Sequence, residues 1–150
     1  MKTSLLPVAT AGTGLVAGLF VAFAIAVMPA LHGADARTFV VTMQRINVSI
    51  VNPLFLLLFL GSPVVLGIGA FLAEHGPERR WALAAFGLTV VALVVTFAVN
   101  IPLNDRLAAA GSTDPAAARE AFEHTWNVAN VARTVLMSAS FAASLVALRL

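Results

Sequence analysis

Long apolar stretches alternate with short polar segments along the 150 residues of the chain. Four of these stretches reach the roughly 20 apolar residues that a helix needs to cross a bilayer. They lie at about residues 7–30, 50–73, 81–100 and 128–148. The strands of a membrane β-barrel would instead alternate apolar and polar positions over about ten residues. The pattern therefore predicts an all-α integral membrane four-helix bundle that forms one domain over residues 1–150.

A fifth helix is expected immediately before the second span, at about residues 35–50. Apolar residues recur from Phe39 to Ile50 at steps of four, three and four, and polar residues interleave with them at similar steps. Two interleaved stripes at this spacing describe an amphipathic helix. Asn52 and Pro53 follow it, and we expect the chain to bend there because proline lacks a backbone N–H.

The fourth apolar helix is predicted to extend well beyond the membrane. Asp114 is a good N-cap, and Pro115 fits the first helical position, where a missing N–H costs nothing. A helix from Pro115 to Leu150 would be about 54 Å long, against a hydrocarbon core of about 30 Å. Its first turns should therefore stand outside the bilayer.

The first span has two further interpretations to consider. Lys2, the apolar run and the small residues near Ala34 resemble a secretory signal, but a signal has an apolar core of only about 7–15 residues. We therefore expect a retained span, with cleavage as the alternative. Gly14 and Gly18 form a GxxxG pair, which indicates close packing within the bundle or, alternatively, a homo-oligomer.

Polar residues gather at one end of the predicted bundle. With four spans, the connections 31–49 and 101–125 lie on the same face of the membrane. Polar groups at the edge of hydrocarbon must find partners or line a cavity. They could simply join helices, at about 0.6–2 kcal/mol for each bond, or line a pocket for a lipophilic small molecule. The residues predicted to line this pocket are Gln44, Asn47, Asn52, Asn100, Asn104, Trp126, Asn127 and Asn130.

Arg133 is the most informative single residue of this cluster. A charge just inside a span is expensive and is expected to face a partner or water. Asp105 and Glu123 are the candidate partners. Arg133 could hold an anionic or carbonyl oxygen of a substrate. Alternatively, its role is structural, and its side chain extends to the membrane–water interface or pairs with an acidic residue.

A metal site is a weaker alternative at the same end. His32, Asp35 and His124 could meet there as ligands, because two imidazoles and a carboxylate suit several transition metals. No HxxxH or ExxH spacing supports this site. The chain has no cysteine, so it has no thiolate ligand or thiol nucleophile. We therefore predict no cofactor and no metal from the sequence.

Composition narrows the class of protein. The chain is 60% hydrophobic and 11% charged, with a mean hydropathy of +0.95, which is far more apolar than a soluble domain. The expected partner is therefore the lipid bilayer. The sequence lacks the basic patch with interleaved aromatic residues that nucleic-acid binding would need, so we do not expect nucleic acid as a partner. Arg79, Arg80 and Arg149 lie in short segments near helix ends, which favours both termini on the cytoplasmic side of a bacterial inner membrane.

Several stretches of the chain, taken in order, resemble the anthrone oxygenase-like family of small four-span membrane proteins. These stretches are Met28-Pro29-Ala30-Leu31, Met43-Gln44-Arg45-Ile46-Asn47, Asn52-Pro53, Val95-Thr96-Phe97, Asn100-Ile101-Pro102-Leu103-Asn104, Trp126-Asn127 and Arg133-Thr134. The resemblance implies oxygen insertion at the methylene carbon of a tricyclic anthrone, which gives an anthraquinone. The residues that it singles out are Gln44, Asn47, Asn52, Asn100, Asn104, Asp105, Trp126, Asn127 and Arg133.

The implied chemistry is compatible with these residues. Removal of a proton from the weakly acidic anthrone carbon gives an electron-rich anion that can react with dioxygen without a metal. Asp105 could act as the base, Arg133 and asparagine donors could stabilise the oxyanion, and Trp126 with phenylalanines could stack on flat rings. We therefore predict an oxygenase for a lipophilic aromatic or quinol-like compound. A non-enzymatic lipid- or quinone-binding protein, or a subunit of a larger complex, is the alternative.

Overall fold

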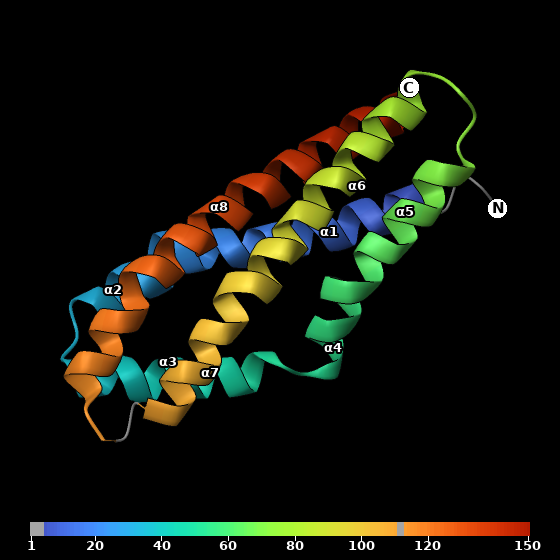
Figure 1. The fold of residues 1–150 in the computed structure, drawn as a ribbon. Coiled ribbons are helices and arrows are strands. Elements are labelled where there is room, and N and C mark those ends of the chain that lie inside the picture. Colours follow the sequence, from blue (N-terminus) through green and yellow to red (C-terminus); the bar gives the residue numbers. More distant parts are fainter. Residues whose placement is uncertain (1–4, 111–112) are drawn as a thin grey trace.

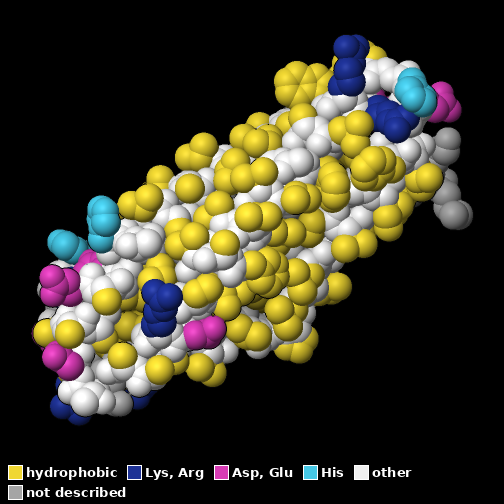
Figure 2. Space-filling view, viewed as in Figure 1, with side chains coloured by type: hydrophobic (Ala, Val, Ile, Leu, Met, Phe, Trp, Pro, Cys, Tyr) yellow, Lys and Arg dark blue, Asp and Glu magenta, His cyan; other side chains and the backbone are white. Residues whose placement is uncertain are grey.

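The computed structural model describes residues 5–110 and 113–150, and this part of the chain is helical with no strand. Lys2, which contributed to the likeness to a secretory signal, lies outside the described residues. Four helical stretches are long and apolar enough to cross a membrane, and they are Leu5–His32, Pro53–Leu72, Pro77–Ala110 and Pro115–Arg149. Apolar side chains cover the middle of the molecule, and charged side chains gather toward its two ends (Figure 2). The predicted all-α four-span fold is confirmed.

The four spans form a ring of neighbouring helices (Figure 1). The long helix α8 (Pro115–Arg149) packs along both α1 (Leu5–Ala22) and α6 (Pro77–Val95). The second span completes the ring where α5 (Ser62–Leu72) packs against α1 and α6. Small buried residues such as Ala85 allow α6 and α8 to approach closely. A hydrogen bond of 2.7 Å between the hydroxyls of Thr89 and Ser140 joins the same two helices.

The amphipathic helix α3 (Ala36–Ile50) lies across one end of this ring (Figure 1). Phe39, Val40 and Met43 on its apolar face are fully buried against α2 (Met28–His32), α7 (Ile101–Ala110) and the first half of α8. Ile46 and Ile50, further along the same face, are half-buried. The core residues at this end are Met28, Phe39, Val40, Met43, Leu103, Leu107, Ala118, Phe122 and Trp126. The extra helix before the second span and the extended fourth helix are both confirmed.

Side-chain caps fix where three of the helices begin. Asp35 accepts hydrogen bonds from the backbone N–H and hydroxyl of Thr38, and these bonds lower the pKa of the Asp35 carboxyl. Asp114 accepts from the N–H of Ala117 at the start of α8. Asn52 accepts from the N–H of Phe55, so the chain turns between α3 and the short helix α4 (Pro53–Leu56), as expected from the proline.

Three of the spans contain one π-helical turn each. These turns are η2 (Phe23–Val27), η3 (Leu57–Gly61) and η4 (Thr96–Asn100). Each turn ends two residues before a proline, which is Pro29, Pro63 or Pro102. A proline cannot donate to the carbonyl four residues earlier and crowds it sterically, so the helix widens just before it. α8 has proline only at its first position and contains no such turn.

The third helix runs further than the sequence predicted. Its span was expected to end at residue 100, just before Ile101-Pro102. The wide turn η4 accommodates Pro102, and the helix continues through α7 to Ala110. As a result, Asn100 and Asn104 lie one turn apart on one continuous helix.

Gly14 is a contact within the bundle. A Cβ atom added there would lie 2.8 Å from the ring of Phe141 in α8, whereas a Cβ atom at Gly18 would meet nothing within 4 Å. The close-packing interpretation of the GxxxG pair therefore holds for Gly14, and Gly18 is exposed on the surface of the chain.

We predict that Gly14→Leu destabilises the protein by about 1–3 kcal/mol, because the new side chain must displace Phe141. Gly18→Leu, on the same helix with open space around it, should leave stability unchanged. Thermal unfolding in detergent measures both variants. Equal melting temperatures for the two would contradict this packing.

Candidate functional site

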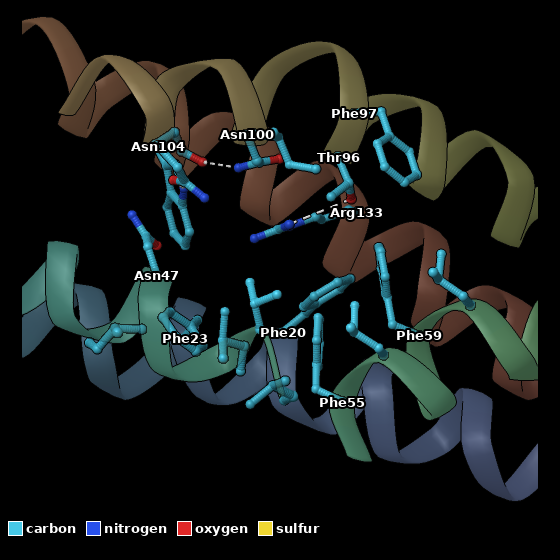
Figure 3. Close-up of a pocket in the computed structure, with 18 residues that line it drawn as sticks. Phe20, Phe23, Asn47, Phe55, Phe59, Thr96, Phe97, Asn100, Asn104 and Arg133 are labelled. Atoms are coloured by element: carbon cyan, nitrogen blue, oxygen red, sulfur yellow. Dashed lines mark hydrogen bonds between the residues drawn. The ribbon is translucent and has the colours of Figure 1, made fainter. Parts of the chain in front are cut away.

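A cavity of about 240 Å³ lies inside the polar end of the bundle (Figure 3). It is bounded by α1, by the chain from α3 through α4 into η3, by η4 with α7, and by α8. All three π-helical turns contribute lining residues or lie directly beside them. Six aromatic side chains supply much of its wall, and they are Phe20, Phe23, Phe55, Phe59, Phe97 and Trp126.

The cavity opens sideways between the second and third spans. Four lining residues near this opening remain partly exposed, and they are Leu56, Leu60, Phe97 and Ile101. All are apolar, and all belong to helices that are apolar enough to span a membrane. The exposed rim of the cavity is therefore apolar, as suits an entrance from the hydrocarbon of a bilayer.

The aromatic rings present flat surfaces to the cavity. Phe55 and Phe59 stack with ring centroids 5.1 Å apart, and Phe20 meets Phe59 edge to face at 6.4 Å. Phe23 packs against Trp126 at 5.8 Å. Planar aromatic groups stack on such ring faces or meet them edge to face. The volume of about 240 Å³ is slightly below the roughly 300–1,000 Å³ typical of small-molecule pockets, which suits a compact ring system.

Arg133 carries a positive charge into this aromatic cavity (Figure 3). The residue is only 7% exposed. Its Nε and one Nη donate to the same oxygen, Oδ1 of Asn130, at 3.2 and 3.1 Å, and its other Nη donates to the hydroxyl of Thr96 at 3.5 Å. The guanidinium carbon lies 4.3 Å from the ring centroid of Phe20 and 5.2 Å from that of Trp126. Two aromatic faces and two neutral side chains therefore hold this cation.

The two carboxylates expected to pair with Arg133 lie elsewhere. Glu123 pairs instead with Arg119 at 2.6 Å and with His32 at 2.7 Å. Asp105 is on the exposed face of α7 and does not line the cavity. Within the described part of the chain, no carboxylate forms an ion pair with Arg133. The predicted pairing was wrong because residues 100, 104 and 133 share the inner face of their helices, whereas residue 105 is turned away.

Three asparagine side chains complete the polar wall. Asn100 is 1% exposed, and its Nδ2 donates to the backbone carbonyl of Trp126 at 3.4 Å. Asn104 accepts from Nε1 of Trp126 at 2.9 Å, which fixes the orientation of the indole. Asn47 enters from α3. Two buried atoms of this wall have no hydrogen-bond partner, namely Oδ1 of Asn100 and Nδ2 of Asn47.

The remaining predicted pocket residues support the site or cap helices. Gln44 donates to the backbone carbonyl of Leu107 at 2.9 Å and so ties α3 to α7. Asn52 caps α4. Asn130 lies behind Arg133, and its Nδ2 donates to the carbonyl of Phe20 at 3.4 Å. Asn127 faces a separate shallow depression beside α2. Of the ten predicted site residues, Asn47, Asn100, Asn104, Trp126 and Arg133 line the cavity.

The three candidate metal ligands have other roles. Asp35 caps α3, His32 bonds to Glu123, and His124 is exposed. Among residues 5–110 and 113–150, no group of three His, Cys, Asp or Glu side chains is placed to hold a metal ion.

Arg119 is a structural residue that sequence reasoning did not single out. Its guanidinium donates to the backbone carbonyls of His32 and Ala34 at 2.7 and 2.6 Å and lies over the ring of Phe39. It thereby fixes the turn between α2 and α3 to the part of α8 outside the apolar segment. Burial alone would raise the pKa of Glu123, but hydrogen bonds from Arg119 and His32 outweigh it and hold that pKa below its usual value.

The fold and the site define a four-span membrane protein with an aromatic cavity that contains one buried cation. The family described as anthrone oxygenase matches residues 54–143, which include the second and third spans and most of the fourth. The chain belongs to this family. Asn47 lies before the matched residues, whereas the other four predicted residues that line the cavity lie within them. No curated protein and no solved structure matches the chain.

We predict that acid removes the stabilisation that Glu123 provides. Because the folded-state pKa of Glu123 is lowered, this stabilisation is complete above the usual value of 4.5 and is lost as the pH falls through the folded value. Wild-type protein should therefore melt above Glu123→Gln at neutral pH, and the two melting temperatures should converge as the pH falls below 4.5 and through the folded value. Thermal unfolding across this range, with the exposed Glu120→Gln as control, measures the effect. A constant difference at every pH would contradict it.

Proposed function

We propose that the protein is an oxygenase of the anthrone type, which oxidises a flat lipophilic aromatic or quinol-like compound with dioxygen in the cavity. The observation that carries this proposal is the guanidinium of Arg133, buried among aromatic rings without a carboxylate partner in the described residues. A buried charge of this kind favours a ligand that develops negative charge beside it. Membership of the anthrone oxygenase family supports the same reaction.

Arg133 would act on the first step of the reaction. An anthrone that loses a proton from its methylene carbon becomes an anion whose charge is delocalised onto the ring oxygen. A guanidinium beside that oxygen stabilises the anion, and it does so more strongly in an apolar cavity than in water. Asn47 offers a second N–H donor from the opposite wall.

The oxidation then balances with dioxygen alone. The anion transfers electrons to dioxygen, a bond forms between the carbon and one oxygen atom, and a proton gives a hydroperoxide on that carbon. Loss of water from this hydroperoxide leaves a ketone. One dioxygen is consumed for each methylene converted, and its two atoms end in the ketone and in water. The carbon is oxidised by four electrons, which dioxygen accepts.

The cavity stabilises the anion without a protein base of its own. None of its 18 lining residues is an Asp, Glu or His. The proposal therefore assigns Asp105 no role in the cavity. A water molecule that enters the cavity with the substrate accepts the methylene proton and returns one when the hydroperoxide forms. Because stabilising the anion lowers the pKa of the substrate carbon, proton loss becomes easier without a strong base.

The sideways opening supports a lipophilic substrate. A compound dissolved in the bilayer reaches the mouth between the second and third spans without crossing the polar end of the bundle. The same opening also suits a non-enzymatic protein that binds a quinone or a lipid tail, and the absence of a base among the lining residues is compatible with that alternative. Dioxygen consumption distinguishes the two.

We predict that purified protein in detergent consumes dioxygen with a small panel of anthrones above the spontaneous rate. Arg133→Met should lower the enzymatic rate about 100-fold, because removal of one preorganised donor to an oxyanion costs about 10²–10³ in rate. Methionine fills much of the same space without the charge, and thermal unfolding of the variant shows whether it folds. Arg106→Met, an exposed arginine of α7 outside the cavity, is the matched control and should keep full activity.

Rates of dioxygen uptake and of anthraquinone formation are measured together. Equal rates in Arg133→Met and wild-type protein would remove Arg133 from the reaction. Aromatic ligands that bind without any dioxygen uptake would favour the non-enzymatic alternative.

A further inference from the structure

We propose that Asn130 is a positioning residue that sets both the orientation and the effective charge of Arg133. Its amide oxygen holds the guanidinium in place, and because the amide is neutral, the positive charge stays available to a substrate oxyanion. Asn130 does not line the cavity, so it acts only through Arg133. This inference rests on the proposed function for the anion that the charge stabilises, but its test does not require turnover.

Asn130 is itself held in one orientation. It is 1% exposed, and its Nδ2 donates to the backbone carbonyl of Phe20 at 3.4 Å. A carbonyl can only accept a hydrogen bond, so a flipped amide would place two acceptor oxygens against each other. Oδ1 of Asn130 must therefore face Arg133. The ring of Phe20 lies 4.3 Å from the guanidinium carbon, so this one residue of α1 supports both side chains.

The hydrogen bonds to Asn130 fix one edge of the guanidinium. Nε and one Nη of Arg133 donate to the same Oδ1 at 3.2 and 3.1 Å, and the other Nη donates to the hydroxyl of Thr96 at 3.5 Å. An arginine has five N–H donors. These bonds use three of them, which leaves two without a partner in the described chain. Because the guanidinium points into the cavity (Figure 3), these two can bind an oxygen of a ligand.

The neutrality of residue 130 is the informative feature. A carboxylate there would have the same shape as the amide and would bind a buried arginine more strongly. It would also cancel the positive charge and repel a negative charge on a ligand. Among the 18 described residues that line the cavity, Arg133 alone is charged, so no other lining residue could replace it. The amide therefore holds the guanidinium without cancelling the charge that an oxyanion requires.

A coloured phenol can report this charge directly. The probe is 2-hydroxyanthraquinone, whose absorption changes when its hydroxyl loses a proton and which has no methylene carbon to oxidise. Its absorbance, bound to the purified protein in detergent across a pH series, gives the pH at which it ionises. The reference is Arg133→Met, in which the probe meets the same aromatic wall without the cation. The difference between the two proteins therefore measures the effect of the guanidinium.

We predict that the probe ionises at least about one pH unit lower in wild-type protein than in Arg133→Met, a tenfold difference in its ionisation constant. Asn130→Asp should bring the ionisation constant to within about threefold of the Arg133→Met value, because the introduced carboxylate cancels the charge. Asn127→Asp is the matched control. It places a carboxylate on the same helix, three residues earlier and outside the cavity, and should keep the wild-type value.

The oxidation should respond in the same way. With an anthrone as substrate, Asn130→Asp should lower kcat at least about tenfold and change KM less than about threefold, because the oxyanion forms only during the reaction. Asn127→Asp should keep both values. A loss of packing alone would not move the ionisation of the probe toward that of Arg133→Met in a folded protein.

Equal ionisation of the probe in wild-type protein and folded Asn130→Asp would overturn the inference. So would equal ionisation in wild-type protein and Arg133→Met, or failure of the probe to bind. If Asn130→Asp does not fold, Asn130→Ser decides, because serine is neutral but too short to hold the guanidinium edge. Its ionisation constant should be at least about threefold weaker than in wild-type protein, and an unchanged constant would overturn the positioning role.

The two proposals can fail separately. The predicted ionisation pattern without any dioxygen uptake would keep the role of Asn130 and reject the oxygenase. Dioxygen uptake at equal rates in wild-type protein and Asn130→Asp would keep the oxygenase and reject the role of Asn130.

Discussion

The structure depends on one constraint, the burial of a full positive charge in an apolar bundle. A cation removed from water requires strong compensation. Here Arg133 obtains it from Asn130, Thr96 and the faces of Phe20 and Trp126, with no carboxylate partner in the described chain. These neighbours come from α1, η4 and α8. The groups that hold the charge also leave one side of it open toward a cavity, where an anionic ligand can complete its environment.

Proline placement creates the space for that cavity. The first three spans widen into a π-helical turn just before Pro29, Pro63 and Pro102, whereas α8 continues without one. At this level the second and third spans separate, although their α5 and α6 segments pack closely toward the other end. α3 then closes the polar end through its buried apolar face. A rigid fourth helix therefore carries the charge, and three bent helices form the walls around it.

Much of this arrangement follows from the sequence. Apolar runs predict the four spans, and residue spacing predicts α3, because both depend on local patterns. The clustering of polar residues at one end follows from topology alone. Which side of each helix faces the cavity could not be predicted in the same way. Asn104 and Asp105 are adjacent in the sequence, and only the packing of α7 shows that Asn104 is the one turned inward. The phenylalanines of the cavity were not identified individually, because in an apolar run a ring facing lipid and a ring facing a cavity look alike. The prolines within the spans were the available signal, because Phe23, Phe59 and Phe97 lie in the π-helical turns that precede them.

The central claim is that the polar end of the bundle binds an aromatic ketone between the second and third spans. Photolabelling with 4-hydroxybenzophenone tests it directly, because the excited ketone attaches to the C–H bonds next to its binding position. After irradiation of the protein in a bilayer, mass spectrometry of its peptides should find the label concentrated in residues 46–60 and 96–104, which contain much of the cavity wall. Excess 2-hydroxyanthraquinone should remove it. Label spread evenly over all four spans, and unchanged by the competitor, would contradict the account.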